Sequence, residues 1–217
     1  MTGFSITALT GEKLSCRRGF KQLFQDLDIT AQAGRALVVT GPNGAGKSSL
    51  LRILSGLLTP SGGNVRLQGG PEEGGLREHL HYLGHDDAVK GALAVAANLD
   101  FWRQVLGPTG LSVEEALEEV GLGGLGRLRA SVLSAGQKRR LAIARLLVSQ
   151  RPVWILDEPT TALDVRAQAR FAAFGRAHLQ AGGILVAATH APLDLGETDE
   201  LSLSGRAITT VDEELEA

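Results

Sequence analysis

One short stretch constrains the fold of this chain more than any other. Residues 41–49, GPNGAGKSS, follow the apolar run ALVVT (36–40) and lead into SSLLRILSGL (48–57), whose apolar residues recur at helical spacing. The order is strand, glycine-rich loop, helix, and the loop matches the pattern G-x-x-x-x-G-K-[ST]. A strand that is apolar throughout and leads into a helix predicts an α/β protein built on a mostly parallel sheet.

The loop has the chemistry of a phosphate cradle. Its glycines let backbone N–H groups turn inward around phosphate oxygens, and the helix N-terminus adds a partial positive charge. Lys47 is expected to reach the β- and γ-phosphates, and the Ser48 hydroxyl to ligate Mg²⁺. A turn that merely connects strand and helix is the alternative, but pattern and context together disfavour it. The predicted nucleotide-binding residues are Gly41, Pro42, Asn43, Gly44, Ala45, Gly46, Lys47, Ser48 and Ser49.

A second apolar strand supplies two carboxylates. VWILDEP (153–159) delivers Asp157 at the strand end, where its carboxylate can hold Mg²⁺ directly or through water. Glu158 follows and, because side chains alternate along an extended chain, is expected to point elsewhere. It is the candidate for polarising the attacking water. A strand that ends in Asp-Glu is commonplace alone, but beside a phosphate loop the pair predicts a Mg–nucleotide site.

Composition limits the classes of partner. A formal net charge of −2 gives no basic footprint for nucleic acid, and KRR (138–140) lacks interleaved aromatic residues. The single cysteine, Cys16, leaves no internal disulfide. No stretch approaches the ~20 apolar residues of a membrane span, and the N-terminus shows no signal-peptide pattern. A membrane role is therefore expected to come through a partner, without direct insertion.

The middle of the chain has helical patterns. AVAANLDFWRQVLG (94–107) and KRRLAIARLLVSQ (138–150) favour helices, and Ser112 with Glu115 predicts a capping box. We predict one domain over 1–217, in which a helical subdomain at about 86–150 is inserted into a core of 1–85 and 151–217.

The two ends of the chain have their own patterns. Segments around 4–9, 22–30 and 64–69 are expected to add an N-terminal antiparallel layer. The acidic end VDEELEA (211–217) is expected to be a solvated tail.

The segment LSAGQKRRLAIARLL (133–147) stands between the two motifs. Here the chain resembles the ATP-binding subunits of ABC transporters, whose signature is usually written LSGGQ and precedes a helix rich in Arg and Ala. Ala135 replaces one glycine. TTALD (160–164) is similar to the family's D-loop, and ATH (188–190) resembles its switch histidine. The resemblance covers almost the whole chain and implies a P-loop NTPase (RecA-like) core with an inserted helical subdomain.

The resemblance also implies a mechanism. Two such domains face each other head to tail, and each ATP lies between one subunit's phosphate loop and the other's signature. A homodimer of this chain would complete both sites, with Ser134, Gly136 and Gln137 contacting the partner subunit's ATP. Glu158 would polarise water and His190 would contact the γ-phosphate. The preference for ATP over GTP rests on the resemblance alone.

Adenine stacking is the weakest match. The family usually has an aromatic residue near position 18, where this sequence has CRRGF (16–20). Arg17 or Arg18 could stack through a guanidinium plane, or Phe20 could serve. The sequence leaves these possibilities open.

Four stretches together look like the branch of the family that serves cytochrome c maturation (haem exporters): residues 14–29, 82–102, LSAGQ and PVWILDEPTTALD. This resemblance implies a peripheral subunit on the cytoplasmic face of the membrane, docked on integral membrane subunits and driving haem export or haem-chaperone release. Another small ABC exporter, or a soluble ABC-type clamp on a macromolecule, is the alternative.

His85 stands where most members of the family carry a glutamine. An imidazole can replace the amide in hydrogen bonding to metal-bound or attacking water, so we predict a γ-phosphate sensor. His79 and His81 alternate along a segment that we expect to be extended, and they are expected to share a face. A haem or metal site with His85 is the alternative, but no further ligand spacing supports it.

Overall fold

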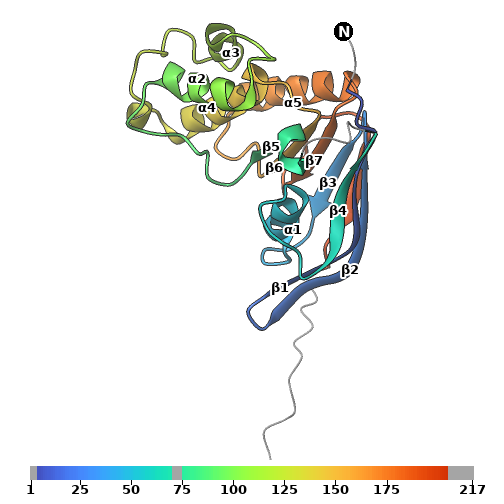
Figure 1. Cartoon of the computed structure of the whole chain (residues 1–217). Helices are drawn as coiled ribbons and strands as arrows, with labels where there is room; N and C mark the ends of the chain where they lie inside the picture. The colour runs from blue at the N-terminus through green and yellow to red at the C-terminus, as the bar shows by residue number, and fades with distance from the viewer. Residues whose placement is uncertain (1–3, 70–74, 205–217) are drawn as a thin grey trace, which may run out of the picture.

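The structure, a computed structural model, describes residues 4–69 and 75–204; the acidic segment 211–217 lies outside them. The chain forms two β-sheets and five α-helices in the described ranges (Figure 1). The strands are β1 (Ala8–Arg18), β2 (Lys21–Gln32), β3 (Ala36–Thr40), β4 (Gly62–Gln68), β5 (Leu80–Leu83), β6 (Val153–Asp157), β7 (Ile184–Ala188) and β8 (Thr198–Ser202). The helices are α1 (Lys47–Leu54), α2 (Val95–Leu106), α3 (Val113–Glu119), α4 (Ala135–Val148) and α5 (Val165–Gln180), with short 3₁₀ turns at Leu76–His79 and Ala130–Val132.

The larger sheet is parallel, with strand order β5-β6-β7-β3-β8. Its central strands come from the three continuous apolar runs, and every residue of β6 and β7 is buried. Strands buried on both faces carry no polar alternation, which is why these runs read as uniformly apolar. The predicted α/β class is confirmed.

The predicted antiparallel layer is confirmed as a sheet of order β2-β1-β4, although its first strand runs over Ala8–Arg18 and not around 4–9. Alternate residues of the parallel strands divide the core between its two faces. Leu37, Ile155 and Val186 pack with α1 and the antiparallel sheet on one face. Trp154 and Leu185 pack with α4 and α5 on the other face. The α1 helix is thereby held between two sheets, which fixes the loop that precedes it.

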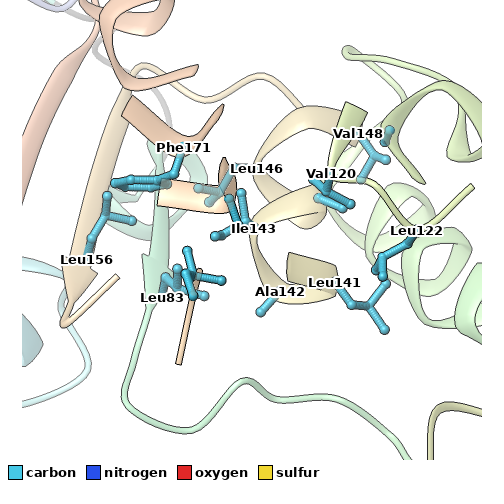
Figure 2. Close-up of a cluster of buried hydrophobic side chains, with 14 of the residues drawn as sticks. Leu83, Val120, Leu122, Leu141, Ala142, Ile143, Leu146, Val148, Leu156 and Phe171 are labelled. Atoms are coloured by element: carbon cyan, nitrogen blue, oxygen red, sulfur yellow. The ribbon is translucent and has the colours of Figure 1, made fainter. Parts of the chain in front are cut away.

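Helices α2, α3 and α4 gather beside α5 at one end of the molecule (Figure 1). Figure 2 shows that α4 carries apolar side chains in two directions. Leu83, Leu156 and Phe171 lie on the side of the parallel sheet, and Val120 and Leu122 lie on the side of α3. One continuous core therefore joins α4 to the strands that end at the site below.

Within residues 4–69 and 75–204, no helix combines the length and apolar character needed to cross a membrane.

Candidate functional site

A pocket of ≈ 610 Å³ opens at the carboxyl ends of β3, β5, β6 and β7. This edge is where parallel α/β sheets bind ligands, because loops and helix N-termini converge there. Most of the residues predicted for nucleotide chemistry line it. The lining consists of Leu23, Asn43, Gly44, Gly46, Lys47, Ser48, Ser49, His85, Asp157, Glu158, Thr161 and His190.

The first turn of α1 faces this pocket with its amide groups free. Gly46 is the N-cap residue, with φ 103°, and no side chain caps the helix. Among the described residues, the N–H groups of Lys47, Ser48 and Ser49 have no backbone acceptor. Unpaired amides at a helix N-terminus form an anion site, since they combine hydrogen-bond donors with the positive end of the helix dipole.

Gly41 is required by close approach of the backbone. Its φ is +135°, and a Cβ at this position would lie 2.4 Å from the Leu203 carbonyl oxygen. Gly41, Pro42 and Ala45 do not line the pocket, but the carbonyls of Gly41 and Pro42 accept hydrogen bonds from Lys47, which does line it. The Lys47 ammonium donates to the carbonyls of Gly41 (2.6 Å) and Pro42 (3.2 Å). These bonds keep the ammonium inside the loop, and phosphate oxygens are stronger acceptors than carbonyls.

His190 lies beside both the phosphate loop and Glu158. Its Nε2 lies 3.2 Å from the Lys47 Nζ and 3.1 Å from the Asn43 Oδ1. A bare Nε2 accepts from Lys47, and a protonated Nε2 donates to Asn43, so the tautomer selects the partner. The same nitrogen is 3.7 Å from the Glu158 Oε1. The imidazole therefore lies between the loop and Glu158.

Asp157 and Glu158 both line the pocket, and the expectation that strand alternation turns Glu158 elsewhere is wrong. The extended chain ends at Asp157, which is buried, and Glu158 has φ +47° in the left-handed region. That turn brings the second carboxylate to the same cavity. A non-glycine residue in this conformation is held by its surroundings at a cost of about 1–3 kcal/mol.

Ser48 and Asp157 suit a magnesium ion by the chemistry of their donors. Both present oxygen to the pocket, and Mg²⁺ is held in proteins by one or two carboxylates together with substrate phosphates and water. No group of three or more His, Cys, Asp or Glu side chains with metal-binding geometry occurs in the part of the chain that the structure describes. The donors present fit a phosphate-assisted ion better than an all-protein cage.

Ser134, Gly136 and Gln137 do not line this pocket. Ser134 caps α4: its hydroxyl accepts from the Gln137 N–H (3.2 Å), and its own N–H donates to the Gln137 Oε1 (2.9 Å). A Cβ on Gly136 would lie 2.7 Å from the Ala162 carbonyl oxygen, so only glycine fits there. The predicted signature therefore lies outside the pocket of its own chain, with Ser134 exposed and Gly136 and Gln137 half-buried.

Two pocket residues were not predicted, Leu23 of β2 and Thr161. Leu23 supplies an apolar wall of the pocket. The sequence could not predict this, because the packing of β2 against the loop is a tertiary contact without a local sequence signal. The predicted adenine-stacking candidates, Arg17, Arg18 and Phe20, do not line the pocket; Phe20 is 97% exposed at the β1–β2 turn.

The predicted shared face of His79 and His81 is wrong. His79 ends a 3₁₀ turn, whereas His81 is buried in β5 with its Nε2–H donating to the Ser149 carbonyl (2.6 Å). Burial lowers the pKa of His81 to about 3, so this imidazole is neutral. It serves as a structural hydrogen-bond donor, and His85 alone of the three lines the pocket.

Comparison with known proteins agrees with this geometry. Residues 24–161 match the family described as ABC transporter. A cytochrome c biogenesis ATP-binding export protein CcmA from Nitrobacter winogradskyi is 53% identical over 92% of this chain and 99% of the relative. The protein of the same name from Bradyrhizobium diazoefficiens is 50% identical over the same shares of the two chains.

Solved structures show the same fold at low identity. A putative ABC transporter ATP-binding protein from Pyrococcus furiosus superposes with a TM-score of 0.77 at 24% identity, covering 91% of this chain and 98% of that one. A bacterial ABC transporter cassette, described as dimeric, gives 0.76 at 21% identity, covering 90% and 94%. The chain is thus an ATP-binding ATPase of the ABC transporter family and belongs, within that family, to the CcmA group of export proteins.

Proposed function

We propose that this chain hydrolyses Mg–ATP in the pocket at the sheet edge and uses the reaction to drive membrane subunits in cytochrome c biogenesis, by haem export or haem-chaperone release. The names of its relatives support the biological role. The observation that carries the hydrolytic role is the meeting of Lys47, Glu158 and His190 in one pocket beside an uncapped helix N-terminus.

The proposed roles follow from charge and donor type. The α1 amides and Lys47 neutralise the β- and γ-phosphates. Ser48 and Asp157 hold Mg²⁺, which adds charge neutralisation at those phosphates. Glu158 orients and polarises the attacking water, and His190 donates to the γ-phosphate from its place beside Glu158. His85 senses the γ-phosphate and passes that state to a docked membrane partner.

The second half of each site comes from a partner subunit in this proposal. Ser134, Gly136 and Gln137 lie outside their own chain's pocket, and Ser134 is exposed, which suits contact with the ATP of a second copy. The dimeric description of one structural neighbour supports the arrangement. We propose an ATP-sandwich homodimer, with 86–150 acting as a helical subdomain within one ATP-binding domain.

The dimer is proposed to work as a peripheral complex on the cytoplasmic face of the membrane, bound to integral membrane subunits. Purification of the tagged chain from membranes tests this directly. We expect co-purified integral membrane proteins, and their absence from a preparation that retains ATP binding would favour a soluble clamp instead.

Glu158→Gln tests the hydrolytic role. We expect ATP affinity within about threefold of wild type and turnover reduced at least about 100-fold, because the amide cannot accept a proton. In sedimentation velocity, Mg–ATP should convert this variant to a stable dimer. Glu197→Gln is the control, since Glu197 is an exposed acid paired with Arg35 away from the pocket. A monomeric Glu158→Gln with Mg–ATP bound would refute the sandwich, and normal turnover would refute the role of Glu158.

A further inference from the structure

Arg139 of α4 is a buried guanidinium whose five N–H groups are all used. Its Nε donates to the Pro159 carbonyl (3.0 Å), and its Nη2 donates to the carbonyls of Asp157 (2.8 Å) and Glu158 (2.6 Å). Its Nη1 donates to the Gly84 carbonyl (2.9 Å) and the Asp87 carboxylate (2.9 Å). The side chain is 3% exposed. One residue therefore joins two segments that are distant in sequence.

The first segment contains Glu158. Three successive carbonyls, 157 to 159, turn toward the guanidinium, and this is the turn in which Glu158 has its left-handed φ. On the other side, the Glu158 N–H donates to the Ala188 carbonyl of β7 (2.8 Å). A strained backbone persists only where its surroundings over-determine it. Arg139 supplies three hydrogen bonds to this turn, at the point from which the Glu158 carboxylate projects.

The second segment contains His85. Gly84 and Asp87 flank it, and both are bound by the same Nη1. The Asp87 side chain is 22% exposed, so its pairing with a nearly inaccessible cation is strengthened by partial exclusion of water. His85 lines the pocket from this tethered segment. A shift of the His85 segment therefore acts on the group that holds Glu158.

We propose that Arg139 is a positioning residue that couples the His85 segment (residues 84–87) to the orientation of the Glu158 carboxylate. The inference rests on the proposed ATP hydrolysis and deepens it. Arg139 lies on α4, the helix that Ser134 caps. A movement of the signature on contact with a partner's nucleotide would therefore be transmitted along this helix to the Arg139 guanidinium. A residue that only satisfies buried carbonyls would affect stability without affecting turnover.

Arg139→Met keeps the length of the side chain and removes every donor. In the full-length chain we expect kcat to fall at least about tenfold while the ATP dissociation constant stays within about threefold, because a small misplacement of a catalytic group costs rate rather than ground-state binding. Arg139→Lys should recover part of the loss. The control is Arg176→Met, which removes an exposed arginine that binds the Asp194 carboxylate and carbonyl. A lower Tm with wild-type kcat per folded molecule would overturn the proposal.

Asp87→Asn tests the link even where Arg139→Met does not fold, since it removes one ionic contact and leaves four carbonyl contacts to Arg139. We expect kcat to fall about threefold and, by hydrogen exchange, a smaller ATP-dependent protection of residues 84–94 than in wild type. Unchanged kcat and unchanged protection would overturn the coupling. Where Arg139→Met folds, the double variant should be no slower than Arg139→Met alone, and additive losses would mean that the two residues act separately.

Glu158→Gln separates the two hypotheses. If Glu158→Gln is inactive and Arg139→Met and Asp87→Asn behave as wild type, only the coupling fails. If Glu158→Gln turns over normally, the proposed hydrolytic role fails first.

Discussion

The first turns of α1 and α4 carry the two motifs that we propose to bind phosphate, yet their hydrogen bonding differs. At α1 the N-cap is a glycine and the leading amides have no partner among the described residues. At α4 the N-cap Ser134 and the third residue Gln137 bind each other in a reciprocal capping box. The first helix end is already open to an anion. At the second, the Gln137 N–H is used by the capping box, and among the described residues the N–H groups of Ala135 and Gly136 have no backbone acceptor.

This difference assigns an order to the proposed reaction. The open end of α1 is preorganised, so it can bind nucleotide phosphates in an isolated chain without rearrangement. The Ser134 hydroxyl can still donate its proton. The backbone N–H of Gln137, however, donates to the Ser134 hydroxyl and becomes available only when the capping box opens. Binding is therefore expected to belong to one subunit, and completion of the hydrolytic site to the contact between two.

Lys47→Ala should have the largest effect, and it should affect only the phosphate loop at the start of α1. Removal of a charge-assisted donor from the phosphate loop is expected to weaken ATP binding at least about 100-fold, or about 2.7 kcal/mol. Isothermal titration calorimetry measures this change. Unchanged affinity would show that the α1 end is not the phosphate site.

Ser134→Arg should separate the two helix ends. The large side chain would block the phosphate position of the partner subunit while the mutant's own loop still binds ATP with wild-type affinity. We expect turnover to fall at least about tenfold in the homodimer. In a mixture with Lys47→Ala chains, the heterodimer pairs the wild-type loop of the Ser134→Arg subunit with the wild-type signature of the Lys47→Ala subunit, which restores one intact composite site. Partial recovery of activity on mixing is therefore expected, and no recovery would contradict head-to-tail pairing.

Mild acid should loosen the far end of α4 before it affects α1. The pKa of His81, which donates to the carbonyl of the C-cap residue Ser149, is lowered by burial to about 3. The native imidazole stays neutral while the unfolded one takes up a proton below about pH 6.5, so stability is present above that pH and is lost as pH falls toward 3. Burial likewise lowers the pKa of His178, to about 4.

Urea unfolding measures this loss. From about pH 7 to about pH 5.5, His81 should lower the free energy of unfolding by about 1.3 kcal/mol. His81→Gln retains a donor but does not titrate, so it should flatten the pH dependence and leave only the share of His178. An unchanged slope would mean that His81 is not a buried neutral group.

The sequence was sufficient for the elements whose signals are local. The glycine-rich loop between strand and helix, the three apolar runs of the parallel sheet, and the Ser112–Glu115 box each depend on residues within a few positions of one another. The helical middle followed from periodicity in the same way. Such patterns record short-range geometry, and the structure confirms them.

The sequence was insufficient where distant segments set the geometry. The left-handed turn at Glu158 is bound by Arg139 of α4, a contact between segments distant in sequence, and strand alternation predicted the direction of Glu158 wrongly. His79 leaves the face of His81 because a 3₁₀ turn precedes β5. The wall made by Leu23 depends on how the antiparallel sheet lies over the loop. In each of these three cases, contacts between distant segments determined the position of the residue, and local sequence patterns do not record such contacts.

The smallest effect gives the sharpest test, because the chain contains two matched capping boxes. Ser112–Glu115 at α3 and Ser134–Gln137 at α4 have the same pair of bonds, at 2.9 Å and 3.2 Å in each. Ser112→Ala and Ser134→Ala should each lower the free energy of unfolding by about 1 kcal/mol, since each removes one N-cap acceptor. Only Ser134→Ala should also lower turnover, because only its hydroxyl is proposed to reach a partner's phosphate. Equal turnover in both variants, at similar stability, would mean that Ser134 serves α4 as a helix cap and nothing more.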